Sequence, residues 1–249
     1  MPLFDVYPLY NVTPVSGKDM LVYDENGTEY LDLYGGHAVI SIGHSHPNYV
    51  KAVSEQVSTL GFYSNAIQNP LQVELANKIE VLSGCSGYEL FLCNSGAEAN
   101  ENALKLASFK TGKARVIAFN NGFHGRTSAA VAATDNKNIV APINAQQAVT
   151  FLALNDFAGV KRELEKGDVC AVIVEFIQGV GGLDQGTAEF FEQVDVLCKA
   201  NNAYFIVDEV QSGYGRSGKF FAFQYYNVTP EVISIAKGMG NGFPIGGIL

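Results

Sequence analysis

The sequence has no long run of apolar residues and few basic side chains. No apolar run approaches the ~20 residues that a membrane-spanning helix needs. Lys and Arg number 16 against 25 Asp and Glu, only four of the basic residues are arginines, and the net charge is −9. Binding to a nucleic-acid backbone requires clustered Lys and Arg. We therefore expect neither a membrane nor a nucleic acid as a partner.

Cysteine is also scarce, and the chain begins without a recognisable leader. Cys85, Cys93, Cys170 and Cys198 are widely separated, and no two of them form a C-x-x-C pair. Cys93 and Cys170 lie inside apolar, strand-like runs, which favours buried, reduced thiols over disulfides or a zinc site. The first residues have neither the basic segment nor the apolar segment of a signal peptide. The sequence therefore predicts a cytoplasmic protein.

The amino-acid composition is typical of a globular protein. Of the 249 residues, 47% are apolar and 11% aromatic, which is too many for a disordered protein. A chain of this length can bury roughly 70% of its unfolded surface. One large domain with a small appendage is therefore feasible.

The periodicity predicts an α/β fold. Asn26-Gly27 between two short β-prone runs predicts a hairpin, and apolar residues then recur at helical spacing over residues 50–60 and 71–82. Strands and helices alternate after that, which implies a mostly parallel sheet covered on both faces, with ligands bound beyond the carboxyl ends of the strands. The expected strands are Glu89–Cys93, Arg115–Phe119, Val169–Val174, Tyr204–Val207 and Val232–Ala236, and the expected helices between them include Ala97–Phe109, Phe157–Glu165 and Thr187–Ala200.

Polar residues follow the first two expected strands. Ser95, Gly96 and Ala97 open a helix, where backbone N–H groups and the Ser95 hydroxyl can form an anion cup or an ordinary helix cap. The next loop carries Phe123 and Arg126, and Arg is the side chain best suited to bind a carboxylate through two hydrogen bonds. By itself this loop is weak evidence, because a Phe-His pair usually serves packing.

Charged residues end the later strands. Glu175 and Asp208 stand where buried strands finish, and a carboxylate there is costly unless it is paired. This favours a functional site, although a cap or a structural ion pair also fits. Lys237 ends the last expected strand, where partial burial lowers a lysine pKa and makes the neutral amine of a Schiff-base lysine available.

Together the strand ends offer the groups that pyridoxal phosphate (PLP) requires. The set comprises a phosphate cup, an aromatic side chain, the carboxylate of Asp208 and Lys237, which follows that Asp by 29 residues. A carboxylate keeps the pyridine nitrogen of the cofactor protonated, so that the ring can take up carbanion electrons. The combination is specific, although no single motif is.

Two further motifs indicate other chemistry. Gly213–Lys219 matches G-x-x-x-x-G-K, but Phe220 stands where a P-loop has its Mg²⁺-binding Ser or Thr. The stretch also follows an acidic strand, whereas a P-loop opens its own βα unit. His44 and His46 have no obvious third ligand, so a hydrogen-bonded loop pair is favoured over a metal site, and we expect no metal.

Motifs along nearly the whole chain carry a family resemblance. The sequence resembles the class III aminotransferases of PLP fold type I, and among them the acetylornithine aminotransferases. This implies a mostly parallel sheet flanked by helices with a small N-terminal α+β segment, residues 1–55 being part of a small domain and residues 56–249 the large PLP-binding domain. The matching segments are Tyr34–Val39, Gly43–Pro47, Asn94–Asn100, Phe123–Arg126, Asp208–Gln211, Ser217-Gly218 and Ala236-Lys237.

The resemblance also implies a role for each candidate residue. Lys237 would carry the cofactor and shuttle the substrate proton, and Arg126 would bind the substrate α-carboxylate with Glu175 in support. The cofactor itself would be held by Ser95, Gly96 and Ala97 at the phosphate, Phe123 and Val210 on the two ring faces, Asp208 at the ring nitrogen and Gln211 at the ring hydroxyl.

The implied reaction is transfer of the δ-amino group of an N-acylated ornithine, acetyl or succinyl, to 2-oxoglutarate in arginine biosynthesis. Members of the family are homodimers acting on small amino acids and 2-oxo acids. Ornithine δ-aminotransferase, 4-aminobutyrate aminotransferase and the aminomutase that makes 5-aminolevulinate are the related alternatives. A P-loop-like nucleotide-binding protein is the alternative from a different class.

The sequence departs from the family pattern in two places. It ends at Leu249, short of the usual length, so we expect these 249 residues expressed alone to be inactive or poorly folded. Val180 stands where the family motif Q-G-E-G-G has Glu. In the family, that Glu pairs with an Arg that otherwise binds a second carboxylate. Its absence predicts a preference for N-succinylornithine over N-acetylornithine, unless another acid replaces it or the loop takes another course.

Overall fold

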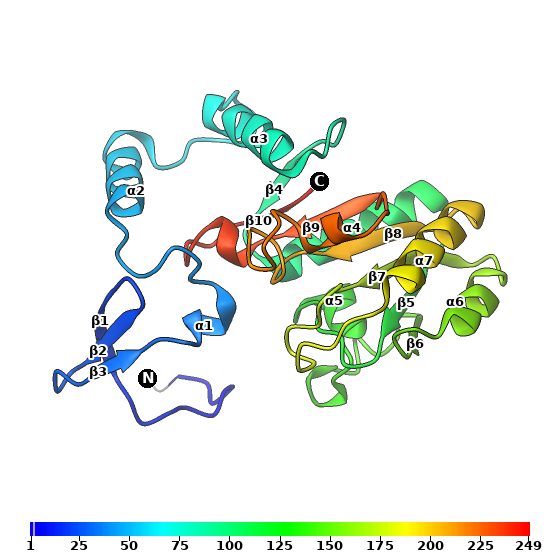
Figure 1. Ribbon diagram of the computed structural model, residues 1–249, viewed down its shortest axis with the longest axis horizontal. Helices are drawn as coiled ribbons and strands as arrows, with labels where there is room; N and C mark the ends of the chain where they lie inside the picture. Colours follow the sequence, from blue (N-terminus) through cyan, green and yellow to red (C-terminus); the bar gives the residue numbers. More distant parts are fainter. Residues whose placement is uncertain (2) are drawn as a thin grey trace. The chain divides into compact units, whose positions relative to one another are not determined.

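The computed structural model describes residue 1 and residues 3–249, and the chain forms two compact units (Figure 1). The first unit is Met1–Gln68 and the second is Asn69–Leu249. The assignment of residues 1–55 to the small domain of the family stays a prediction.

A three-stranded antiparallel sheet forms the centre of the first unit. Its strands are β1 (Pro14–Lys18), β2 (Leu21–Asp24) and β3 (Glu29–Leu31), followed by α1 (Gly35–Ala38) and α2 (Pro47–Leu60). The predicted hairpin is confirmed. Gly27 adopts a φ of 79°, and the Asp24 carboxylate accepts hydrogen bonds from the backbone N–H groups of Asn26 (2.9 Å) and Thr28 (2.8 Å).

The second unit is a seven-stranded sheet with helices on both faces, in the strand order β4-β10-β9-β8-β7-β5-β6. Strands β6, β5, β7, β8 and β9 are parallel, and β10 runs antiparallel to both of its neighbours. The mostly parallel sheet predicted from the sequence is therefore confirmed. Its strands are β4 (Phe91–Cys93), β5 (Arg115–Phe119), β6 (Val149–Leu152), β7 (Val169–Val174), β8 (Tyr204–Asp208), β9 (Val232–Ile235) and β10 (Gly246–Ile248), and its helices are α3 (Pro70–Ser83), α4 (Gly96–Thr111), α5 (Ser128–Ala132), α6 (Phe157–Leu164) and α7 (Ala188–Ala200), with 3₁₀ turns η1 (Lys137–Ile139), η2 (Ala222–Tyr225) and η3 (Lys237–Met239).

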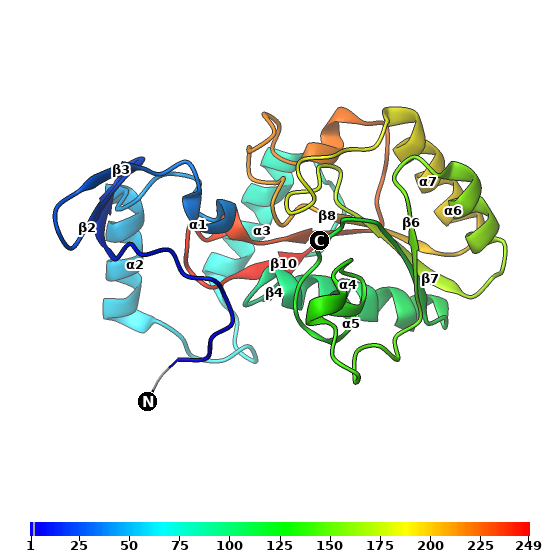
Figure 2. The ribbon, with the colours of Figure 1, turned by 90° about the horizontal axis from the view of Figure 1, so that it is seen from below.

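The central strands are buried on both faces because helices cover both. Figure 2 shows α4 and α5 on one side of the sheet and α6 and α7 on the other. Successive side chains of a strand point to opposite faces. Accordingly Ala171 and Ile173 pack in the cluster that contains α4, while Val172 and Val174 pack in the cluster that contains α7. This explains why β7 reads as one continuous apolar run.

The structure corrects some expected boundaries. β4 begins at Phe91 rather than at Glu89, because its ladder with β10 begins there. β9 ends at Ile235, β8 extends to Asp208, and α7 begins at Ala188 with Thr187 as its cap.

Three strands, β1, β6 and β10, were not predicted. Two of the three residues of β10 are glycines, which carry no strand signal of their own. Only the ladders on its two sides make this segment a strand.

The described residues contain four free cysteines, all buried, as the sequence predicted. Burial raises the pKa of each of these thiols above its ordinary value. In the described part of the chain, no helix is long and apolar enough to cross a bilayer.

Candidate active site

The sequence-predicted residues of the second unit gather at the carboxyl edge of its sheet. Asp208 is the last residue of β8, Glu175 follows β7 directly, and Lys237 comes two residues after the end of β9. The first turn of α4 follows β4, and the Phe123–Arg126 loop follows β5. Because parallel strands end at the same edge, residues far apart in the sequence become neighbours here.

Asp208 is the most constrained of these groups. Its side chain is 3% exposed. Its Oδ1 accepts a hydrogen bond from the Val210 backbone N–H at 3.0 Å, and its Oδ2 accepts one from Asn100 Nδ2 at 2.7 Å. His124 Nδ1 lies 2.8 Å from the same Oδ2. Since an ionised carboxylate only accepts, the proton of this pair sits on Nδ1 of His124.

The charge of Asp208 changes the titration of His124. Burial lowers the pKa of this imidazole, but the hydrogen bond and the negative charge of Asp208 oppose burial and raise the pKa above its ordinary value overall. The backbone of the loop is held as well, because Thr134 Oγ1 accepts a hydrogen bond from the His124 N–H at 2.9 Å.

Glu175 connects two loops of the site. Its carboxylate oxygens accept hydrogen bonds from the backbone N–H groups of Phe123 (2.9 Å) and Gly179 (3.0 Å). Burial raises the pKa of Glu175, and the nearby charge of Asp208 adds to this effect. The carboxylate thus fixes the backbone position of Phe123, whose ring is partly exposed at the site.

The first turn of α4 supplies backbone donors. Ser95 is the helix cap, and its Oγ accepts a hydrogen bond from the Glu98 N–H at 3.1 Å. The N–H groups of Gly96 and Ala97 precede the first residue with an intrahelical acceptor, and they lie at the positive end of a 16-residue helix. The capping role is therefore present, and it leaves these two N–H groups for an anion.

Two glycines permit the close approach of these segments. A Cβ on Gly96 would lie 2.6 Å from Cγ1 of Val210, so the α4 turn packs directly on the residue after Asp208. A Cβ on Gly179 would lie 1.7 Å from Oε1 of Gln211, so the loop after β7 packs directly on the loop after β8. At Gly96 a side chain would clash with the branched Val210, whereas at Gly179 it would displace the flexible end of the Gln211 side chain.

Lys237 is partly buried and lies in the field of two carboxylates. Burial lowers the pKa of its amine below the ordinary value, although the charges of Asp208 and Glu175 act in the opposite direction. Within the described residues, its ammonium forms no hydrogen bond or salt bridge. The lowered pKa predicted for a lysine at a buried strand end is therefore found.

Arg126 lies on the exposed rim of this edge, in a loop that α4 holds in place. The Glu101 carboxylate accepts hydrogen bonds from Thr127 Oγ1 at 2.8 Å and from the backbone N–H of Ala129 at 2.9 Å. Val180 is exposed on the loop after β7. The site residues predicted for the second unit thus share one edge of the sheet.

The two competing motifs take structural roles. Lys219 of the G-x-x-x-x-G-K stretch donates to the Gln224 carbonyl at 2.6 Å and lies 4.5 Å from the centre of the Tyr225 ring. The stretch leads into the short 3₁₀ turn η2 rather than into the α-helix of a P-loop. This geometry does not form a nucleotide cradle.

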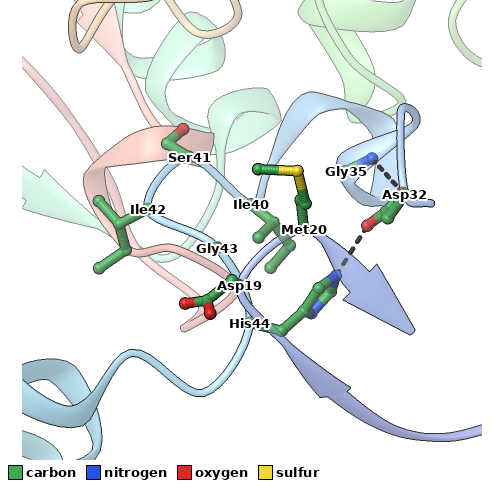
Figure 3. A pocket seen from close by; sticks show the side chains of 9 residues that line it. All are labelled: Asp19, Met20, Asp32, Gly35, Ile40, Ser41, Ile42, Gly43 and His44. Carbon is green, nitrogen blue, oxygen red and sulfur yellow. Dashed lines mark hydrogen bonds and ion pairs between the residues drawn. The ribbon is translucent and has the colours of Figure 1, made fainter. Parts of the chain in front are cut away.

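The histidine pair belongs to the first unit. His44 Nε2 lies 2.7 Å from Asp32 Oδ2, and Asp32 Oδ1 accepts from the Gly35 N–H, beside a pocket of about 330 Å³ (Figure 3). His44 is thus hydrogen-bonded, as expected. His46 differs, because its buried Nδ1 has no partner among the described residues. No group of three potential metal ligands occurs in the described part of the chain.

The sequence interpretation gave no role to His124, to Asn100 or to Ser234, whose hydroxyl donates to Asn100 Oδ1 at 2.5 Å. Ser234 is a hydroxyl inside the otherwise apolar strand β9, and Asn100 lies one turn into α4. A polar residue that interrupts a buried strand was the available signal, because such a group needs a partner.

Comparison with known proteins identifies the family to which the chain belongs. The family model described as "Aminotransferase class-III" matches residues 6–249. The chain belongs to the class III aminotransferases. The acetylornithine aminotransferase of Bacillus subtilis (strain 168) is 41% identical to this class III chain over 248 residues, which cover 99% of the chain and 64% of the relative.

Solved structures agree with this assignment. An N-acetylornithine aminotransferase from Stenotrophomonas maltophilia K279a has a TM-score of 0.83 at 34% identity, covering 98% of this class III chain and 62% of that one. An ornithine aminotransferase from Toxoplasma gondii, reported with partial occupancy of PLP at its active site, has a TM-score of 0.90 at 28% identity, covering 99% and 60%. The chain thus spans less than two thirds of the length of these relatives.

Proposed function

We propose that this protein is a PLP-dependent aminotransferase that transfers the δ-amino group of an N-acylated ornithine to 2-oxoglutarate, a step of arginine biosynthesis. The observation that carries the proposal is the position of Lys237. Its partly buried amine, with a lowered pKa, stands at the strand edge where Asp208 and Glu175 are also found. The family membership and the 41% identity to an acetylornithine aminotransferase support the same reaction.

The chemistry of the site fits the cofactor. The free N–H groups at the start of α4 suit a phosphate, and the Phe123 and Val210 side chains offer apolar surfaces for a planar ring. Oδ1 of Asp208 has a single backbone donor, so it retains capacity to accept a hydrogen bond from a protonated ring nitrogen. Lys237 supplies the amine that holds the aldehyde carbon.

When it is bound, PLP accepts the electron pair that is left at the substrate carbon after a proton is removed. Once the substrate amine has taken its place at the aldehyde carbon, Lys237 Nζ would be the free amine that takes that proton and returns it, because its lowered pKa makes the neutral form accessible. Asp208 would pair with the ring nitrogen through Oδ1, the oxygen that has a single backbone donor. Arg126 binds the substrate α-carboxylate, and Glu175 holds the loop before it through the Phe123 N–H.

We further propose that the enzyme acts as a cytoplasmic homodimer. Four buried, free thiols support a reducing compartment. Apolar side chains that remain exposed on α2, Val50 and Val57 among them, support a further protein contact. Sedimentation of the purified protein tests the dimer.

Replacement of Lys237 tests the central assignment. In Lys237→Ala, we expect loss of transamination and loss of the cofactor adduct that borohydride reduction leaves on the wild-type peptide containing this lysine, measured by mass spectrometry. Lys219→Ala is the matched control, because Lys219 is held by Gln224 and Tyr225. A wild-type adduct that forms on a different lysine contradicts the assignment, and ATP binding that is lost only in Lys219→Ala restores the nucleotide-binding alternative.

Substrate comparison tests the acyl group. In the full-length protein, kcat/KM is compared for N-acetylornithine, N-succinylornithine, ornithine and 4-aminobutyrate, before and after Val180→Glu. We expect an acylated ornithine to be preferred, with the succinyl substrate favoured as long as Val180 is present. Preference for free ornithine would assign the enzyme to the ornithine δ-aminotransferases instead.

A further inference from the structure

Behind Asp208 lies a chain of buried polar side chains from three different elements. Ser234 on β9 donates to Oδ1 of Asn100 on α4 at 2.5 Å, and Asn100 Nδ2 donates to Oδ2 of Asp208 on β8 at 2.7 Å. Ser234 and Asn100 are at most 1% exposed. None of the roles inferred from the family resemblance involves either residue.

The amide of Asn100 can adopt only one orientation. Its Nδ2 donates two hydrogen bonds, one to Asp208 Oδ2 and one to the His124 carbonyl at 2.8 Å, while its Oδ1 accepts from Ser234. A flipped amide would place its oxygen against two acceptors, Asp208 Oδ2 and the His124 carbonyl, neither of which can donate. These two acceptors therefore select the orientation that presents N–H to Asp208, and the Ser234 hydroxyl satisfies the amide oxygen on the other side.

This arrangement distinguishes the two oxygens of Asp208. Oδ2 faces two donors, Asn100 Nδ2 and His124 Nδ1, whereas Oδ1 receives only the Val210 N–H. The carboxylate is thereby fixed in rotation, with Oδ1 as the oxygen that keeps a free lone pair. A carboxylate that accepts a hydrogen bond from a ring nitrogen in one direction must be held in one rotational position.

We propose that Asn100, held in place by Ser234, is a positioning residue that aims Oδ1 of Asp208 at the ring nitrogen of PLP. The proposal rests on the proposed function, since it concerns the same cofactor. It assigns a role in cofactor binding to two residues that touch neither substrate nor cofactor.

Three variants separate positioning from space filling. Asn100→Asp keeps the shape but replaces the donor with an acceptor, and Ser234→Ala removes the hydroxyl that donates to the amide oxygen and holds the side chain in place. In both, we expect the dissociation constant for PLP to rise by about tenfold or more, as is typical when an outer partner of a binding group is lost. Ser234→Thr keeps the hydroxyl, and we expect it to retain the wild-type constant.

Spectroscopy and kinetics measure properties that would not change if these residues served only to maintain the fold. The absorbance band of the bound cofactor should shift in Asn100→Asp and Ser234→Ala, and kcat should fall while KM for the amino donor stays nearly unchanged. Ser212→Ala is the matched control, because it also removes a buried serine hydroxyl, one that donates to Oε2 of Glu209 at 2.7 Å rather than to Asn100. It should leave the dissociation constant and the band unchanged.

The outcomes distinguish this proposal from the function on which it rests. If the wild-type protein binds no PLP, the proposed function fails. If the wild type binds but Asn100→Asp and Ser234→Ala bind equally well with the same absorbance band, only the positioning role fails. An equal loss in Ser212→Ala also overturns that role, since any buried serine would then have the same effect.

Discussion

Lys237 combines an unusual backbone conformation with a partly buried amine. Its backbone φ is 47°, in the left-handed region that a residue with a Cβ seldom adopts. Its amine is also partly buried, and the pKa is lowered as a result. Both features cost free energy. Strained conformations of this kind are concentrated at functional sites, where the surrounding structure holds them in place.

Arg126 is the residue proposed to bind the substrate carboxylate. We expect Arg126→Lys to lower kcat/KM by roughly tenfold to a hundredfold, because a lysine cannot form the paired hydrogen bonds that a guanidinium makes with a carboxylate. The dissociation constant for PLP should change little. Steady-state kinetics with both the amino and the oxo substrate measure the effect.

Arg162→Lys on α6 is the control for that experiment, since it makes the same exchange at an exposed arginine far along the chain. Normal kcat/KM in Arg126→Lys for both half-reactions would show that another group binds the substrate carboxylate.

At the scale of elements, one buried carboxylate organises the segment between β8 and η2. Glu209 follows Asp208 and is fully buried. Its Oε1 accepts from the Phe223 N–H at 2.8 Å, and its Oε2 accepts from Ser212 Oγ at 2.7 Å. Burial raises the pKa of Glu209 to about 7. Adjacent residues of one motif therefore differ in what they bind. Asp208 lies among the candidate site residues, whereas Glu209 holds the backbone of the following loop.

The raised pKa predicts how stability depends on pH. The folded protein binds the Glu209 proton more tightly than the unfolded chain, whose pKa is near 4.5. The resulting stabilisation is complete below pH 4.5 and is lost as pH rises to about 7. Glu209→Gln mimics the protonated form, so the variant should lose less stability than the wild type across that window, by up to about 3 kcal/mol.

Urea denaturation at several pH values between 4.5 and 8 measures this difference. Glu55→Gln, at an exposed position on α2, provides the comparison for loss of one surface charge. Parallel pH profiles for the wild type and Glu209→Gln would contradict the assignment.

At the scale of the whole molecule, the apolar core is unevenly distributed. All the buried apolar side chains among the described residues belong to the second unit, where two clusters cover the two faces of the sheet. In the first unit, Asp24 is the single buried residue among those described. The sheet of the first unit therefore depends on hydrogen bonds and turn geometry more than on burial.

This difference predicts unequal protection of backbone amides. We expect amides of β7 and β8 to exchange with solvent only on global unfolding, while those of β1–β3 exchange faster by at least tenfold, because few buried contacts oppose local opening. Hydrogen exchange with mass spectrometry of the 249-residue chain measures both. Equal protection of the two sheets would show that the first unit is stabilised by contacts other than its own interior.

The sequence alone determined the elements with strong patterns and the residues that end them. The apolar run of β7 and the helical spacing of α2 and α3 depend on local periodicity, so they were predictable. The positions of Asp208, Glu175 and Lys237 were predictable for a related reason, since a charged residue at or near the end of a buried strand is conspicuous in a linear sequence. The family motifs added an expected role for each of these residues.

The tertiary structure decided what depends on neighbours distant in the sequence. β10 exists because β4 and β9 flank a glycine-rich segment, and its own residues carry no strand signal. Ser234 and Asn100 are 134 positions apart, and only the packing of α4 on β9 brings them to one hydrogen bond behind Asp208. Periodicity reports which face a residue occupies, whereas a hydrogen-bond partner across the sheet is set by register and packing, which local sequence does not encode.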